Sequence, residues 1–150
     1  MRVLILSIML LACYDIEAKR SPCTYEQSIR GENEADRLRS WDSVYRWYKL
    51  YARCENAAAQ EGVSESITRL LVDRWASIKA FDGLARAHPG FRRFALGGIN
   101  TTLNMKDVTQ IEAQAKSRCP AALHELCKAI ESAAAFAIEE DASFHKQGEK

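Results

Sequence analysis

The sequence predicts an all-α protein, a compact bundle of about six or seven helices stacked as antiparallel hairpins and tied by disulfides. Two observations support this fold class. The three prolines of the chain, Pro22, Pro89 and Pro120, each fit the start of a helix, where the missing N–H breaks no hydrogen bond. Apolar residues recur at spacings of three and four, and the alternation typical of strands is absent from the sequence.

An export leader is predicted by Arg2 and the uncharged residues 3–11 that follow it. This apolar run is too short for a membrane span, which needs about 20 residues, and it suits the central region of a signal peptide. One processing route removes residues 1–18 as a signal peptide. A second follows the segment LLAC, which resembles a bacterial lipobox and would remove residues 1–12 and acylate Cys13. A third alternative keeps the run as a buried helix.

The helices expected after the leader begin at residues that cap or start helices well. A helix over residues 24–38 precedes one over residues 41–54, which Ser40 caps. A third helix follows Ser64, and a break near residues 76–77 separates it from a short helix that ends before the second proline. The remaining helices are expected at residues 89–96, after Asn104, and from Pro120 onward. Together they form a single helical domain over residues 19–142, followed by a polar tail at 143–150.

The apolar positions of these helices predict which side chains form the core. They share helical spacing and large apolar or aromatic side chains. We expect the core to contain Trp41, Val44, Trp47, Tyr48, Ile67, Leu71, Trp75, Ile78, Phe91, Phe94, Ile111, Leu123, Leu126 and Ile130.

The cysteines outside the leader are even in number and predict disulfides. In either export route Cys13 is cleaved off or acylated and so forms no disulfide. The cysteines that can pair are then Cys23, Cys54, Cys119 and Cys127. Four cysteines in an oxidising compartment allow three pairings. The alternative is four buried thiols in a cytosolic protein, since free cysteine packs as a small apolar residue. The predicted leader favours disulfides.

The predicted helices favour two of these pairs. Cys23 opens the first helix and Cys54 closes the second, so an antiparallel hairpin brings them together. On one straight helix, Cys119 and Cys127 would have Cα atoms about 12 Å apart, whereas a disulfide tolerates at most about 7 Å. This pair therefore requires Cys119 to lie in a turn before the last helix, which Pro120 favours.

The segment SWDSVYRWYKLY resembles the second helix of a tetratricopeptide repeat, where a small residue and an aromatic open the helix and another aromatic follows. Thirty-four residues later, the length of that repeat, WASIKAF echoes the segment. At this offset the equivalent residues of the two segments are Trp41 and Trp75, Ser43 and Ser77, Val44 and Ile78, and Trp47 and Phe81. The resemblance is to tetratricopeptide-like helical-hairpin proteins of the bacterial envelope. It implies repeat-like stacking of hairpins in the N-terminal half.

The same segment carries aromatic and basic residues around most of the helix circumference. Such a helix is either central in a bundle or shared with a partner. Tyrosine and tryptophan, which keep one polar group, are enriched at protein interfaces. The residues predicted to contact a partner are Trp41, Tyr45, Arg46, Trp47, Tyr48, Lys49 and Tyr51.

The charge balance gives no general attraction to nucleic acid or to an anionic membrane. Lysine and arginine number 21 and aspartate and glutamate 20, and removing the leader brings the net charge near zero. The expected partner is therefore another envelope or extracellular protein, with membrane contact only through an acyl chain on Cys13. The sequence leaves the oligomeric state open.

Catalytic and metal-binding patterns are weak. His124, Glu125 and Cys127 lie close in sequence, but they supply only two strong ligands for a metal, and Cys127 is better used in a disulfide. No glycine-rich phosphate loop is present. We therefore expect no enzyme activity, no metal and no cofactor.

Three function classes remain. The leading one is an exported helical interaction protein, periplasmic, secreted or lipid-anchored, that acts as an envelope adaptor, inhibitor or immunity-type binder. The alternatives are a carrier of small apolar ligands and an enzyme that uses the His124/Glu125 region.

Overall fold

The structure, a computed structural model, describes residues 23–54 and 56–148 and is all-helical in that part of the chain. It confirms the predicted fold class. In chain order the helices are α1 (Tyr25–Ala35), α2 (Trp41–Tyr51), α3 (Ala57–Asp73), α4 (Ile78–Ala87), α5 (Pro89–Gly97), α6 (Met105–Ser117) and α7 (His124–Gly148). Short 3-10 turns at Trp75–Ser77 and Ala121–Leu123 precede α4 and α7.

Capping residues place the first two helices, and the structure shortens both of them relative to the prediction. Thr24 and Ser40 accept backbone N–H groups in the first turns of α1 and α2. The helices end at Ala35 and Tyr51, each three residues earlier than expected. The residues after Tyr51 form a turn instead, because the chain must bend back for Cys54 to reach the start of α1.

The predicted start of the third helix is wrong. α3 begins at Ala57, and Ser64 lies buried within it. The side chain of Asn56 accepts the Ala59 N–H and caps this earlier start. Three alanines follow at residues 57–59, and alanine has the highest helix propensity of all residue types. The break expected near residues 76–77 is confirmed by the 3-10 turn there.

The C-terminal prediction needs two corrections. The last helix proper begins at His124, after a 3-10 turn that follows Pro120. α7 also continues to Gly148, through most of the residues expected to form a polar tail. No proline or glycine interrupts residues 121–147, so nothing in the chain ends the helix sooner.

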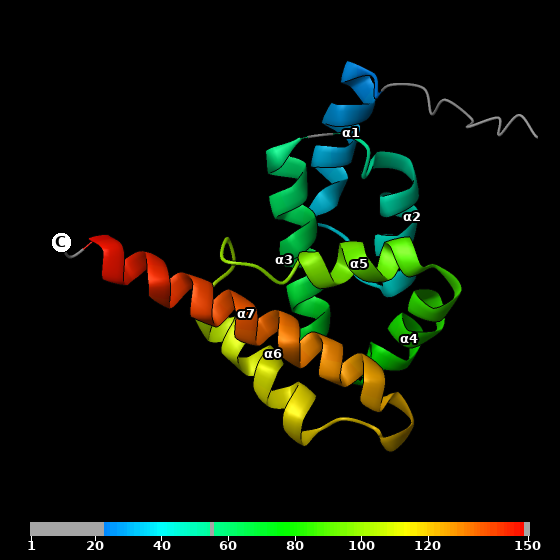
Figure 1. The fold of residues 1–150 in the computed structure, drawn as a ribbon. Coiled ribbons are helices and arrows are strands. Elements are labelled where there is room, and N and C mark those ends of the chain that lie inside the picture. The colour runs from blue at the N-terminus through cyan, green and yellow to red at the C-terminus, as the bar shows by residue number, and fades with distance from the viewer. Residues whose placement is uncertain (1–22, 55, 149–150) are drawn as a thin grey trace, which may run out of the picture.

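The helices stack as hairpins around α2 and α3 (Figure 1). α1 and α2 form the first pair, and α6 and α7 form the last, joined by the turn that contains Cys119. α2 contacts α1, α3, α4 and α5, which makes it the central helix of the N-terminal half. α5 crosses in front of α2 and α3, and the C-terminal part of α7 extends beyond the bundle (Figure 1). None of the described helices is long and apolar enough to span a membrane.

The core agrees closely with the predicted residues. Twelve of the fourteen are buried, while Tyr48 and Phe94 are only partly buried. At four of the described glycines an added Cβ would lie 3.0 Å or less from a neighbouring side chain, and Gly62 is one of them. A Cβ added at Gly62 would lie 2.9 Å from the Ala35 Cβ, so the α1–α3 crossing requires glycine at this position.

Each tryptophan combines burial with a hydrogen bond from its indole N–H. Trp41 donates to the Ser77 Oγ at 3.0 Å, and Trp47 donates to the backbone carbonyl of Gly31 at 2.8 Å. Trp75 donates to the carbonyl of Arg118 at 2.9 Å. The Trp47 bond therefore connects α2 to α1, and the Trp41 bond connects α2 to the turn before α4. The Trp75 bond connects that turn to the end of α6.

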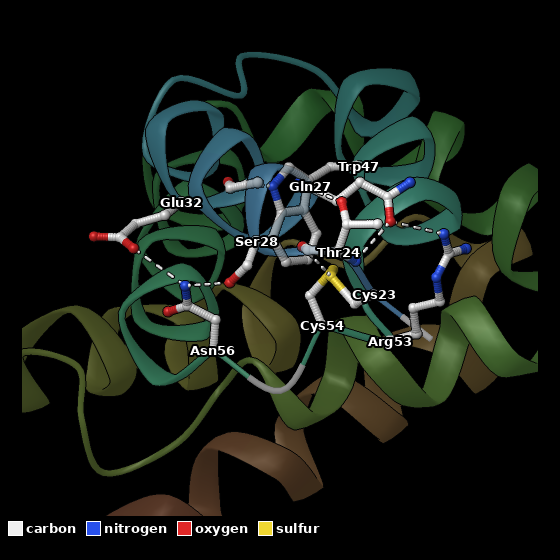
Figure 2. Close-up of a disulfide and its surroundings, with 10 residues drawn as sticks. Cys23, Thr24, Gln27, Ser28, Glu32, Trp47, Arg53, Cys54 and Asn56 are labelled. Carbon is white, nitrogen blue, oxygen red and sulfur yellow. Dashed lines mark hydrogen bonds between the residues drawn. A yellow bond between two sulfur atoms is a disulfide. The ribbon is translucent and has the colours of Figure 1, made fainter. Parts of the chain in front are cut away.

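Both predicted disulfides are confirmed. Cys23 and Cys54 close the α1–α2 hairpin with Cα atoms 5.2 Å apart. Figure 2 shows that the same end of α1 is also held by side chains from after α2: Arg53 donates to Gln27, and Asn56 donates to Ser28 and Glu32.

Cys119 and Cys127 have Cα atoms 6.0 Å apart. Cys119 lies outside α6 and α7, in the turn that carries Pro120, and Cys127 lies in the first turns of α7. The turn brings the two residues together, as the spacing argument required. Two disulfides are typical of a chain that folds in a non-reducing compartment.

Burial makes Tyr51 sensitive to alkaline pH. Its hydroxyl donates to the Glu34 carboxylate at 3.4 Å. Burial raises the pKa of the Tyr51 hydroxyl, the Glu34 charge raises it further, and Arg30 opposes the shift. Because the folded pKa exceeds the unfolded value of about 10, the stability from the neutral phenol is complete below that pH and is lost as pH rises through the folded pKa.

We therefore expect the free energy of unfolding to fall more between pH 8 and pH 11 in the wild type than in Tyr51→Phe. The upper pH is chosen because it lies about one unit above the ordinary tyrosine pKa. Urea titrations at both pH values measure this difference. Tyr25→Phe is the control, since Tyr25 is 81% exposed and should keep the wild-type loss. The hydrogen bond to Glu112 raises the pKa of Lys116. Because Lys116 is present in all three proteins, its contribution to the loss is the same in each and cancels in the comparison. An equal loss in Tyr51→Phe would contradict the prediction.

Candidate binding site

The seven residues predicted to contact a partner fall into two groups in the structure. Trp41, Trp47 and Tyr51 are buried in the core, where a partner cannot reach them. The reason is that α2 is surrounded by four helices, so its most apolar side is used inside the fold. The other four remain candidate contact residues: Tyr45, Arg46, Tyr48 and Lys49, of which the two tyrosines are partly buried and the two basic residues exposed.

Tyr45 is the centre of a partly exposed aromatic cluster. Its ring stacks on His88 with centroids 4.5 Å apart and planes at 17°. The Phe91 ring is steeply inclined to it, with centroids 5.2 Å apart and planes at 70°, and the Lys49 ammonium lies 4.8 Å from the Tyr45 ring centroid. A cation at this distance from an aromatic face is attracted by the ring electrons.

Tyr48 extends the cluster toward α5. Its ring centroid lies 5.0 Å from that of Phe94 and 5.6 Å from that of Phe91. We define the α2–α5 aromatic surface as the partly buried or exposed members of this cluster: Tyr45, Tyr48, Lys49, His88 and Phe94. The phenol and imidazole rings keep polar atoms, so this surface combines apolar area with hydrogen-bonding groups.

Pro89 and Gly90 are the residues that allow His88 and α5 to lie against α2. Pro89 occupies the first helical position of α5, and a residue before proline is kept out of the helical conformation, as His88 is with φ −136° and ψ 84°. Gly90 lets the first turn of α5 approach Tyr48, because a Cβ there would lie 2.7 Å from the Tyr48 Oη. Sequence reasoning did not assign His88 to the contact residues, and the His-Pro-Gly step is the signal that locates it.

The two helices that carry the aromatic surface are rich in basic residues. α2 and α5 carry four basic residues, Arg46, Lys49, Arg92 and Arg93, against one acidic residue, Asp42. None of the four forms an ion pair with another described residue. The chain as a whole has a formal charge of only +1, so positive charge is concentrated on these two helices.

A groove of about 300 Å³ lies beside this surface, between α3 and α5. Phe94 belongs to both features. The groove is lined by Gln60, Val63, Ser64, Ile67, Arg93, Phe94, Gly97, Gly98 and Asn100. Sequence reasoning did not identify it, because its two walls come from helices that are distant in the chain.

The two side chains that name the His124/Glu125 region are exposed. The side chains of His124 and Glu125 are 76% and 90% exposed, with Nδ1 and Oε1 3.8 Å apart. Cys127 is in a disulfide, so it supplies no thiol nucleophile to His124. Within residues 23–54 and 56–148, no three histidine, cysteine or acidic side chains come together in a way that could hold a metal ion.

No family model, curated protein or solved structure matches this chain. The tetratricopeptide resemblance therefore stays a prediction. In the structure the two echoing segments touch each other: Trp41 stacks on Phe81 with ring centroids 4.2 Å apart, and its indole donates to Ser77. Trp41 opens an α-helix, whereas Trp75 opens a 3-10 turn. The predicted leader, including Cys13, lies outside the described residues.

Proposed function

We propose that this protein is an exported, disulfide-tied binding protein whose α2–α5 aromatic surface contacts another envelope or extracellular protein. In this role it acts as an adaptor, an inhibitor or an immunity-type binder, periplasmic, secreted or anchored through an acyl group on Cys13. The observation that carries the proposal is the partly exposed Tyr45 ring, which stacks on His88 and has the Lys49 ammonium 4.8 Å from its centroid.

Export is supported by two independent features. Arg2 is followed by an apolar run suited to a signal peptide. The described cysteines form two disulfides, which persist in oxidising compartments and are rare in the cytosol. The finer choice between a soluble and an acylated form depends on how residues 1–18 are processed.

A binding role is supported by the composition of the surface. Aromatic residues and arginine are enriched at protein interfaces, and those with the largest energetic effect lie in well-packed surroundings. Tyr45 and Tyr48 meet this condition, because both rings pack against the buried Phe91 ring. Their rings are thus fixed before a partner arrives, which lowers the entropy lost on binding.

Site-specific photo-cross-linking tests the proposal. Protein produced in its native cells carries a benzoyl-phenylalanine at position 45 or, as a control, at position 25, where Tyr25 is 81% exposed on α1. We expect one envelope or extracellular protein to cross-link from position 45, and this product to weaken when Lys49→Glu is added. Intact mass of the recovered protein reports whether the leader was removed and whether Cys13 is acylated.

Two results would contradict the proposal. Equal cross-linking from positions 45 and 25 would mean that the aromatic surface has no special role. A mass that begins at Met1 in the recovered protein would contradict export.

A further inference from the structure

The α3–α5 groove has an apolar interior and a basic edge. Val63 and Ile67 are buried side chains of α3, and Phe94 faces them from α5. Arg93 lies at the groove with an exposed side chain, and no acidic residue lines it. A groove of this composition fits a ligand that has an apolar group next to a negative charge.

Two glycines line the groove on the side of α5. Gly98 is buried, and a Cβ there would lie 2.9 Å from the Ile67 Cδ1. Gly97 is exposed, and a Cβ there would meet nothing within 4 Å. Glycine at position 97 therefore leaves free space at the edge of the groove without being needed for packing.

The size of the groove limits what it holds. At about 300 Å³ it is at the lower end of the range for small-molecule pockets, which suits one apolar side chain better than a whole lipid or cofactor. Membrane-binding surfaces work in the opposite way, by inserting protruding apolar side chains into the lipid. The exposed large apolar residues of the described chain are elsewhere: Tyr25, Ile29, Leu50, Phe136 and Phe144.

We propose that the α3–α5 groove receives an apolar side chain from an acidic segment of the partner protein, with a neighbouring carboxylate paired to Arg93. This inference rests on the proposed function and names the chemistry of the partner. The Arg93 guanidinium at the groove edge attracts the acidic segment, and the groove selects the apolar residue within it. Phe94 contributes to both parts of the contact.

Synthetic peptides test the inference directly. The probe is a glutamate-rich peptide with one central leucine, compared with the same peptide carrying serine in place of leucine and with a lysine-rich peptide carrying the leucine. Amide chemical shifts of the isotope-labelled protein give both the location and the dissociation constant. We expect the first peptide to shift residues 63–67 and 93–98, and the other two to bind about tenfold more weakly or not at all.

Matched variants separate groove binding from general charge. Gly97→Leu should fill the groove edge and weaken the first peptide about tenfold, whereas Gly83→Leu, also in open space but on α4, should not. Arg93→Gln should weaken binding by a similar factor, whereas Lys79→Gln, an exposed cation on α4, should leave it unchanged. Thermal unfolding of all four variants checks that the fold is intact.

The inference is overturned if Gly97→Leu binds the first peptide as tightly as the wild type does, or if the serine peptide binds equally well. Phosphatidylglycerol vesicles that shift the same residues would overturn it too, since they would assign the groove to a membrane surface. Failure of the peptides alongside a specific cross-link from position 45 removes this inference and leaves the proposed function standing. Peptide binding without any specific cross-link supports the ligand chemistry of the groove and contradicts the α2–α5 aromatic surface as the contact site.

Discussion

Replacing Trp47 by alanine is expected to lower the free energy of unfolding by about 3–5 kcal/mol, the range for removing a large buried aromatic side chain. Trp47 is 1% exposed and packs against Tyr51 and Phe94, with ring centroids 5.9 Å away in each case. Its indole also donates the hydrogen bond to the Gly31 carbonyl. The variant therefore leaves both a cavity and a buried carbonyl without its partner, and urea unfolding measures the sum.

Two further variants divide this effect into its parts. Trp47→Phe keeps most of the ring volume but loses the donor to Gly31, so about 1–3 kcal/mol of the loss should remain. Leu50→Ala is the surface control on the same helix. Leu50 is 54% exposed, and its truncation should change stability by no more than about 0.5 kcal/mol. A loss below about 1 kcal/mol for Trp47→Ala would mean that α2 is not central.

Removing the Cys23–Cys54 disulfide is expected to cost about 3–4 kcal/mol, because it closes a loop with a sequence separation of 31 residues in the unfolded chain. The same relation gives about 2.5 kcal/mol for Cys119–Cys127, whose separation is 8 residues. The comparison is well matched, since each pair joins one buried cysteine to one partly buried cysteine. Double serine variants of each pair, unfolded in urea, measure both values.

A greater loss in the Cys119/Cys127 variant than in the Cys23/Cys54 variant would contradict the loop-length argument. Non-reducing peptide maps of protein from its own compartment provide the independent control on connectivity. A peptide containing Cys23 linked to either C-terminal cysteine would contradict the hairpin itself, and four free thiols would contradict export.

Local sequence was sufficient where one residue type decides one structural feature. Ser40 and Thr24 are side-chain caps that begin helices, and Pro89 can occupy only a first turn, so these starts follow from the chain alone. α3 was misplaced because Asn56 and Ser64 are both acceptable caps. The choice depended on the alanines after Asn56 and on the burial of Ser64 against other helices.

The chain by itself thus determined the helical class, the two disulfide pairs and nearly all of the core, since each depends on periodicity or on the reach of a hairpin. Tertiary structure alone decided which side of α2 is free. Periodicity identifies an apolar face but does not count the helices packed around it, and four helices cover Trp41, Trp47 and Tyr51. The same holds for the stack of His88 on Tyr45 and for the α3–α5 groove. Their residues are far apart in sequence, and only packing of whole helices sets their distance.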